Sequence, residues 1–175
     1  MIAASSREEP AFASVDAVRF RAIMRNPVSS VAIVATGECG NRAGCTVTAV
    51  CSLSDSPPSL LVCLNRQSTA RQAVIDNRRF TVNYLDESQQ GDADLLAGRL
   101  GMQGEGKFSP ERWETGPNGL PCLRGALAVL VCELADVTEF GSHSIFYGEI
   151  REAMVHDQAR PLLYGQGRYL TASIG

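Results

Sequence analysis

Apolar and polar residues alternate along most of this chain, and the alternation predicts a protein built mainly of β-strands. The segment 30–36 is rich in β-branched residues, and 79–85 alternates Phe80, Val82 and Tyr84 with other residues. The expected strands are 30–36, 43–53, 59–64, 79–85, 125–138, 144–155 and 162–170. Because these strands do not alternate regularly with helices, we expect a closed or nearly closed barrel instead of a doubly wound sheet.

A few short helices are expected beside the strands. One is expected to follow Ser14 as its N-cap and to end at Pro27, which cannot extend a helix. A second begins after Ser68, and a third spans 92–100. The remaining assignments are a flexible N-terminal tail over 1–14, one domain over 15–175, and a Gly- and Pro-rich loop over 101–119.

The charge balance argues against nucleic acid or a membrane as partner. The chain of 175 residues has 20% charged residues and a net charge of −3. Its polar start, MIAASSREEP, does not resemble a signal peptide, and no apolar run approaches the ~20 residues of a membrane helix. We therefore expect a cytoplasmic protein.

The six cysteines are consistent with the expected cytoplasmic location. None forms a CxxC pair, and with only two histidines in the chain we expect no metal site. Cys45, Cys51, Cys63 and Cys132 lie in apolar or β-branched runs. We expect them to be small buried hydrophobic residues in a reducing compartment.

The segment 44–54, which precedes Pro57-Pro58, is the first candidate for chemistry. Thr46, Thr48 and Ser52 are short enough to let backbone groups reach the polar edge of a flat heteroaromatic ligand. Their hydroxyl groups also suit a phosphate. The alternative is an ordinary half-buried strand with a polar face.

Two further segments carry candidate ligand-binding groups. Asn65-Arg66-Gln67-Ser68-Thr69 joins a strand to a helix start, where free N–H groups and a guanidinium suit an anion. The alternative is an ordinary N-cap beside a solvated arginine. His143 follows a flexible turn and suits a bound dinucleotide; the alternative, which the residues alone favour, is a structural histidine at a strand start. No GxGxxG, GxSxG, Walker or HExxH motif is present.

Taken together and in this order, these segments resemble the short-chain flavin reductases of the 4-hydroxyphenylacetate 3-monooxygenase reductase type. These are the reductase components of two-component flavin-dependent monooxygenases. The resemblance covers about 20–169. Its motifs are GxTxxAxxSxSxxPP over 44–58, the Asn-Arg-x-Ser after 60–64, F-x-V-N-x-L over 80–85, Gly141-Ser142-His143, and P-L-x-Y with Gly167-Arg168-Tyr169.

The resemblance implies a split β-barrel that binds FMN or FAD at a homodimer interface and transfers hydride from NADH or NADPH. Reduced flavin would then be supplied to an oxygenase component. The residues implied for the isoalloxazine ring are Thr46, Val47, Thr48, Ala49, Val50, Ser52 and Leu53. Those implied for the phosphate are Arg66, Gln67 and Ser68, and those facing the nicotinamide nucleotide are His143, Arg168 and Tyr169.

The implied chemistry needs no protein nucleophile and no metal, because hydride passes directly between the two cofactors. One departure concerns Ser142, which stands where the family often has an acid, and it affects the orientation of His143. Two alternatives stay open. The chain is then either a flavin-dependent reductase of another acceptor, such as a corrinoid cobalt, or a flavin- or haem-binding protein without turnover.

Overall fold

The computed structural model describes residues 14–172, so nearly all of the predicted tail over 1–14 lies outside the described residues. The helices are α1 (Ala17–Met24), α2 (Thr69–Asn77) and α3 (Gln90–Leu96), with 3-10 turns η1 (Glu87–Gln89), η2 (Gly104–Lys107) and η3 (Pro117–Gly119). Strands dominate the rest, as the alternation predicted.

The main sheet has seven antiparallel strands in the order β3-β2-β6-β9-β10-β5-β4. Their bounds are β2 (Ala32–Thr36), β3 (Ala43–Val47), β4 (Val50–Asp55), β5 (Pro58–Asn65), β6 (Arg79–Tyr84), β9 (Ala128–Phe140) and β10 (His143–Val155). A second sheet joins β1 (Ser29–Ser30), β11 (Leu162–Gly165) and β12 (Arg168–Thr171). A third pairs β7 (Trp113–Thr115) with β8 (Pro121–Leu123).

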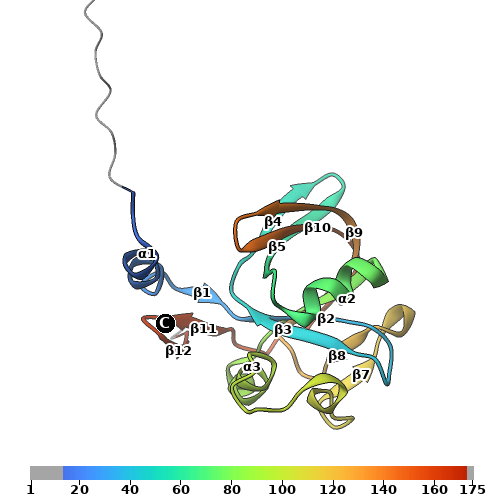
Figure 1. Ribbon diagram of the computed structural model, residues 1–175. Coiled ribbons are helices and arrows are strands. Elements are labelled where there is room, and N and C mark those ends of the chain that lie inside the picture. Colours follow the sequence, from blue (N-terminus) through green and yellow to red (C-terminus); the bar gives the residue numbers. More distant parts are fainter. Residues whose placement is uncertain (1–13, 173–175) are drawn as a thin grey trace, which may run out of the picture.

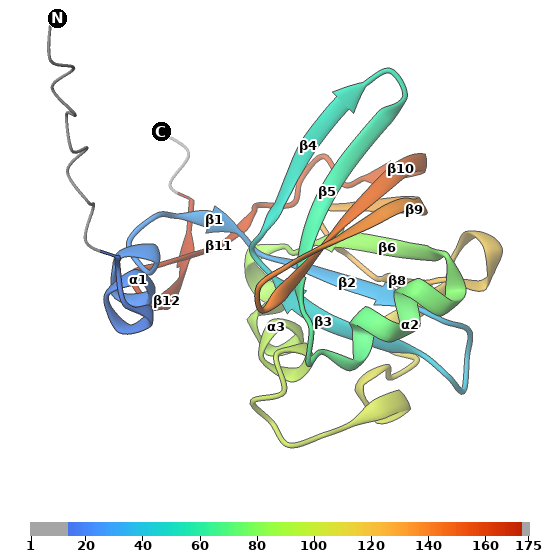
Figure 2. The same ribbon diagram turned by 45° about the horizontal axis from the view of Figure 1, so that its top comes forward.

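The two edges of the main sheet are β3 and β4, and they are consecutive in the chain. Only Thr48 and Ala49 separate them, so Val47 and Val50 lie within about 10 Å of each other. The sheet must therefore curl until its edges approach, yet β3 pairs only with β2 and β4 only with β5. The result is a split barrel with a seam at Thr48–Ala49. Figure 2 shows the β4–β5 hairpin projecting beyond the rest of this sheet.

Two hydrophobic cores lie on opposite faces of the sheet, and β2 contributes to both. Ala32 and Val34 face the barrel interior with Phe80 and Phe146, whereas Ile33 faces α3, β8 and the smaller β1-β11-β12 sheet. All five residues of β2 are buried, as expected for a central strand covered on both faces. Figure 1 shows α2 beside this sheet and α1 with β1, β11 and β12 to one side of it.

The strands over 59–64 and 79–85 are confirmed as β5 and β6, and the strand pair over 125–138 and 144–155 as β9 and β10. The predicted strand 43–53 is wrong as one element, since it forms β3 and β4 on opposite edges. The strand 162–170 is a hairpin of β11 and β12, and the loop 101–119 contains η2, β7 and η3.

Two smaller predictions also need correction. Asp16, not Ser14, caps α1, because its carboxylate accepts hydrogen bonds from the backbone N–H groups of Val18 and Arg19. Cys51 is exposed on β4, an edge strand with one side unpaired, so it is not a core residue. All six cysteines carry free thiols.

Candidate functional site

A groove of about 960 Å³ lies between β3, the start of α2 and the segment after α3. We call it the main groove. Among the predicted cofactor residues it is lined by Thr46, Gln67 and Ser68. The structure thus brings together two of the segments singled out in the sequence, the small-residue strand and the strand-to-helix junction.

Gly44 shapes the floor of the main groove. A Cβ atom at this position would lie 2.9 Å from the carbonyl oxygen of Val34 and 3.2 Å from side-chain atoms of Leu96 and Phe108. Only glycine allows β3 to pack this closely against its neighbours. Next to it, the Thr46 hydroxyl donates to the carbonyl of Ala93 at 2.6 Å, which ties β3 to α3 and leaves only the oxygen lone pairs for a ligand.

The start of α2 gives the main groove an end suited to an anion. Ser68 is the N-cap residue, as predicted, but its side chain makes no capping hydrogen bond. Its hydroxyl lies within hydrogen-bond reach of the Cys45 thiol, which also lines the groove. The first N–H groups of the helix have no intrahelical acceptor. Lys107 also lines the groove, and its ammonium group has no ion pair or hydrogen bond within residues 14–172.

Arg42, the other cation of the groove, is already engaged. Its guanidinium binds the Glu105 carboxylate and donates to the carbonyl of Phe108 at 2.9 Å. Burial acts to raise the pKa of Glu105, but hydrogen bonds from Arg42 outweigh it and hold that pKa below its usual value. Lys107 is therefore the cation in the described part of this groove that stays free for a ligand.

A smaller hollow of about 210 Å³ adjoins the main groove, and we call it the side hollow. Thr46 and Ala97 line both spaces. The side hollow adds Val47 and Thr48 from the predicted ring-binding segment, together with Tyr169. Three predicted cofactor residues of the strand therefore lie beside one from the C-terminal hairpin.

Tyr169 is held in place by polar and aromatic neighbours. Its hydroxyl donates to Asp94 at 3.0 Å, and its ring meets that of Tyr164 edge-on at 5.4 Å. Arg99 lies over the ring at 5.6 Å and pairs with Asp94 at 2.7 Å. Burial and the hydrogen bond to Asp94 raise the pKa of Tyr169 to about 12, so the phenol stays neutral at physiological pH.

The Arg66 and His143 segments are neighbours, because His143 on β10 lies opposite Asn65 on β5. The backbone N–H of Arg66 donates to the carbonyl of Ser142 at 3.0 Å. The Ser142 hydroxyl shares a hydrogen bond of 2.9 Å with Nδ1 of His143, so a serine orients this imidazole. Both Arg66 and His143 are exposed, and neither lines the main groove.

Glu139 holds the Arg66 side chain. Nε of Arg66 lies 3.0 Å from the Glu139 carboxylate, which also binds Arg71 and accepts a hydrogen bond from the buried Ser144 at 3.0 Å. Hydrogen bonds from Arg71 and then Ser144 lower the pKa of Glu139. For Arg66 to bind a phosphate, its guanidinium has to leave this carboxylate.

The remaining predicted site residues lie apart from the two spaces. Val50 is half-buried, while Ala49, Ser52 and Leu53 are exposed along the seam and β4. Arg168 lines a separate hollow of about 350 Å³ next to Tyr169. Within residues 14–172, no three His, Cys, Asp or Glu side chains are gathered as a metal site requires.

Three residues of the site were not predicted from the sequence: Lys107, Asp94 and Arg99. Lys107 is the chain's only lysine and lies in the Gly-rich loop, which is a signal that was available. No sequence signal marks Asp94 and Arg99, because only the fold places them against Tyr169.

A comparison with known protein families identifies the family of this chain. The model of the flavin reductase like domain matches residues 24–173. The chain belongs to this family. The resemblance expected from its motifs is thereby confirmed, and so is the mainly β, split-barrel fold class.

Curated relatives of this flavin reductase chain match along most of their length. The FMN reductase (NADH) RutF of Methylorubrum extorquens is 37% identical over 171 residues, which cover 98% of this chain and 82% of the relative. The 4-hydroxyphenylacetate 3-monooxygenase reductase component of Salmonella typhimurium is 36% identical over 152 residues, which cover 87% and 89%.

Solved flavin reductase structures share the fold. BorF, the flavin reductase component of a bacterial two-component tryptophan halogenase, superposes with a TM-score of 0.83 at 30% identity, covering 89% of this chain and 98% of its own. The NADH:FAD oxidoreductase SgcE6 of Streptomyces globisporus, in complex with NAD and FAD fragments, has a TM-score of 0.82 at 27% identity, covering 90% and 93%.

Across residues 14–172, every helix is too short or too polar to cross a bilayer.

Proposed function

We propose that this chain is an NAD(P)H-dependent flavin reductase, which transfers hydride from NADH or NADPH to FMN or FAD. The observation that carries the proposal is the main groove, whose lining combines Ser68, Lys107 and the start of α2, all suited to an anion, with the small residues of β3. The names of the RutF relatives specify FMN and NADH, so this pair is tested first.

The donor set of the main groove suits a phosphorylated, flat heteroaromatic ligand. A volume of about 960 Å³ lies within the range of small-molecule sites. Hydroxyl, amide and ammonium donors line the same groove, while Leu96 and Met102 give apolar surface. Gly44 lets the strand run close to this surface. We propose that Gln67, Ser68 and Lys107 bind the flavin phosphate.

Arg66 is a further phosphate ligand in this proposal, provided that its guanidinium leaves the Glu139 carboxylate. Its guanidinium pairs with the Glu139 carboxylate, and both groups are exposed. Exposed ion pairs are weak, so the guanidinium can exchange this carboxylate for a phosphate. The isoalloxazine ring is assigned to the seam, with Thr46, Val47, Thr48, Ala49, Val50, Ser52 and Leu53 as its lining. On the unpaired side of each edge strand, N–H and C=O groups have no neighbouring strand and are available to the polar rim of a ring. The Ala49 carbonyl is not among them, since it accepts from the N–H of Cys63 at 3.0 Å.

The nicotinamide nucleotide is assigned to Tyr169, Arg168 and His143. Tyr169 has a fixed, neutral ring at the side hollow, and Ser142 fixes the imidazole of His143. When both nucleotides are bound, the cofactors themselves supply the hydride donor and acceptor. The protein holds the two rings in contact and excludes water. A small improvement in their alignment raises the rate of hydride transfer strongly.

We further propose that the chain acts as a homodimer. Along β4, Ser52 and Leu53 are exposed although they belong to the proposed ring-binding segment, so a second subunit is needed to cover the ligand there. All residues of α1 are exposed as well, including Val18 at 71% and Phe20 at 57%. Exposed apolar clusters of this kind are typical of protein interfaces. Sedimentation as a monomer that binds flavin tightly would contradict this proposal.

The biological setting follows from the same relatives. The Salmonella relative is the reductase component of a monooxygenase, which supports a partner oxygenase that receives reduced flavin from this chain. Six free thiols support a reducing compartment, and we propose the cytoplasm.

The deciding experiment mixes the protein with NADH and FMN and follows the loss of nicotinamide absorbance. Turnover that depends on both compounds supports the reductase. Flavin binding without NADH or NADPH oxidation, with FMN or FAD, would make the chain a binding protein instead. A matched reaction with NADPH and FAD identifies the preferred pair.

A further inference from the structure

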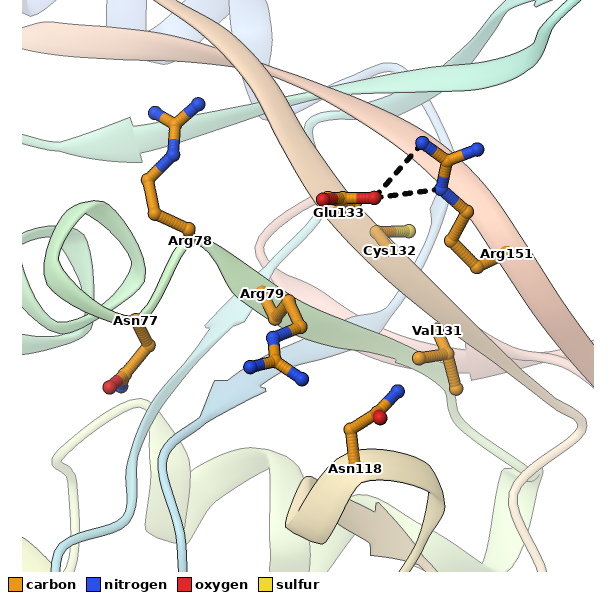
Figure 3. A pocket seen from close by; sticks show the side chains of 8 residues that line it. All are labelled: Asn77, Arg78, Arg79, Asn118, Val131, Cys132, Glu133 and Arg151. Atoms are coloured by element: carbon orange, nitrogen blue, oxygen red, sulfur yellow. Dashed lines mark hydrogen bonds and ion pairs between the residues drawn. The ribbon is translucent and has the colours of Figure 1, made fainter.

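A second cavity, of about 530 Å³, lies at the opposite end of α2 from the main groove. Its lining includes Arg78, Arg79, Asn118, Val131, Glu133 and Arg151, and we call it the arginine cavity (Figure 3). No residue of its lining belongs to the main groove or the side hollow. On α2 the main groove reaches Ala73 and the arginine cavity begins at Asn77, so about 6 Å of helix axis separates the two linings.

The arginine cavity is locally basic in a chain of net charge −3. Three guanidinium groups line it against one carboxylate. Two of the three have partners: Arg151 pairs with Glu133 at 2.9 Å and with Glu149 at 2.8 Å, and Arg78 donates to the carbonyl of Leu134 at 2.8 Å. The single carboxylate of the lining is thus neutralised by Arg151.

Arg79 is the exception, because its guanidinium has no ion pair or hydrogen bond within the described residues. Glu133 lies directly opposite Arg79 in the β6–β9 register, yet its carboxylate is turned to Arg151. Figure 3 shows the guanidinium of Arg79 and the carboxamide of Asn118 pointing into the same space. The Asn118 amide also has no partner in residues 14–172. Two sets of unpaired donors therefore converge in one cavity.

An apolar wall completes this site. Arg79 and Val131 lie on the same face of the sheet, because Arg79 pairs with Glu133 and Thr81 pairs with Val131 two residues along. Val131 lines the cavity but is only 2% exposed, so its side chain is fixed at the floor and a small part of it reaches the space beside the donors. The site offers a planar fork of donors for an oxyanion, an amide for a second hydrogen bond, and a contact for a hydrocarbon body.

We propose that the arginine cavity binds a small organic oxyanion, either a phosphate monoester or a carboxylate, at a site separate from the cofactor groove. Arg79 binds the oxyanion, Asn118 donates a second hydrogen bond, and Val131 contacts the apolar part of the ligand. This proposal is independent of the proposed function.

The test is calorimetric titration of the full chain, in the presence of saturating FMN, with phenyl phosphate, benzoate and inorganic phosphate. We expect one site, with phenyl phosphate or benzoate bound more tightly than inorganic phosphate. The tighter of the two organic probes identifies the head group. Arg79→Ala should weaken binding at least tenfold, and Arg79→Lys should restore part of it.

The control variants separate this site from the cofactor groove. Asn118→Gly removes the amide while tolerating the backbone φ of 54° at this position, and it should weaken binding by a smaller factor. Lys107→Met and Arg124→Ala should leave it unchanged, because neither residue lines the cavity. Absence of binding by every probe, or equal binding by folded Arg79→Ala and the wild type, would overturn the proposal.

Discussion

Replacing Lys107 by methionine tests the phosphate end of the main groove. Lys107 lines the groove with an ammonium group that has no partner in the described residues, and methionine keeps its apolar stem. A charge-assisted hydrogen bond to a phosphate contributes about 1.5–3 kcal/mol. Because 1.4 kcal/mol corresponds to a tenfold change in affinity, Lys107→Met should weaken FMN binding roughly 10- to 150-fold.

The assay compares FMN with riboflavin, which has the same ring but no phosphate. Quenching of flavin fluorescence gives both dissociation constants, and Lys107→Met should change only the constant for FMN. Arg124→Met is the matched control, since it removes a positive charge that lies outside the groove and pairs with Glu114 at 2.7 Å. Unchanged FMN affinity, or an equal loss for riboflavin, would refute the assignment of Lys107 to the phosphate.

Three other predictions follow from named contacts. His143→Ala should lower kcat/KM for NADH by roughly 5- to 150-fold and leave flavin affinity unchanged, because one hydrogen bond of about 1–3 kcal/mol to the nucleotide is lost. If stopped-flow measurements show unaltered flavin reduction, His143 has a structural role only. Asp94→Asn should lower the pKa of Tyr169 from about 12, seen as tyrosinate absorbance at lower pH than in the wild type. Since the folded pKa lies above the unfolded value of about 10, Tyr169 stabilises the wild type fully below pH ~10 and loses this contribution as pH rises toward 12; a variant with the same alkaline unfolding curve would contradict this. Asn83→Ala should lower the free energy of unfolding by about 2–4 kcal/mol in urea titrations, because the buried amide binds Leu123 at 2.8 Å and Ile33 at 3.2 Å; a loss under about 0.5 kcal/mol would show that these groups find other partners.

Strands bounded by strong local signals were predicted well from the sequence. The apolar run over 59–64 lies between Pro58 and the helix cap Ser68, and the structure places β5 at Pro58–Asn65. The alternation over 79–85 likewise matches β6 at Arg79–Tyr84. In both cases the residues that decide the element lie within the element or beside it.

The strand 43–53 was predicted as one element because both halves have the same local pattern. Its break at Thr48–Ala49 depends on the closure of the sheet, which places β3 and β4 on opposite edges. The residues proposed to bind the phosphate show the same contrast. Gln67 and Ser68 were predictable from a strand-to-helix junction, whereas Lys107 depends on how Phe108 and Trp113 pack the loop against the core.

The seam also explains why the barrel stays open. If β3 and β4 paired with each other, the N–H and C=O groups along both edges would be used in the sheet and none would remain for a ligand. In the structure each edge pairs on one side only, and the residues at the opening are small: Thr46, Thr48 and Ala49. Larger side chains there would fill the space beside Tyr169 and Ala97. On the proposed function, the missing strand pair is therefore what gives the flavin ring its polar contacts, and the barrel gives up part of its hydrogen bonding to bind it.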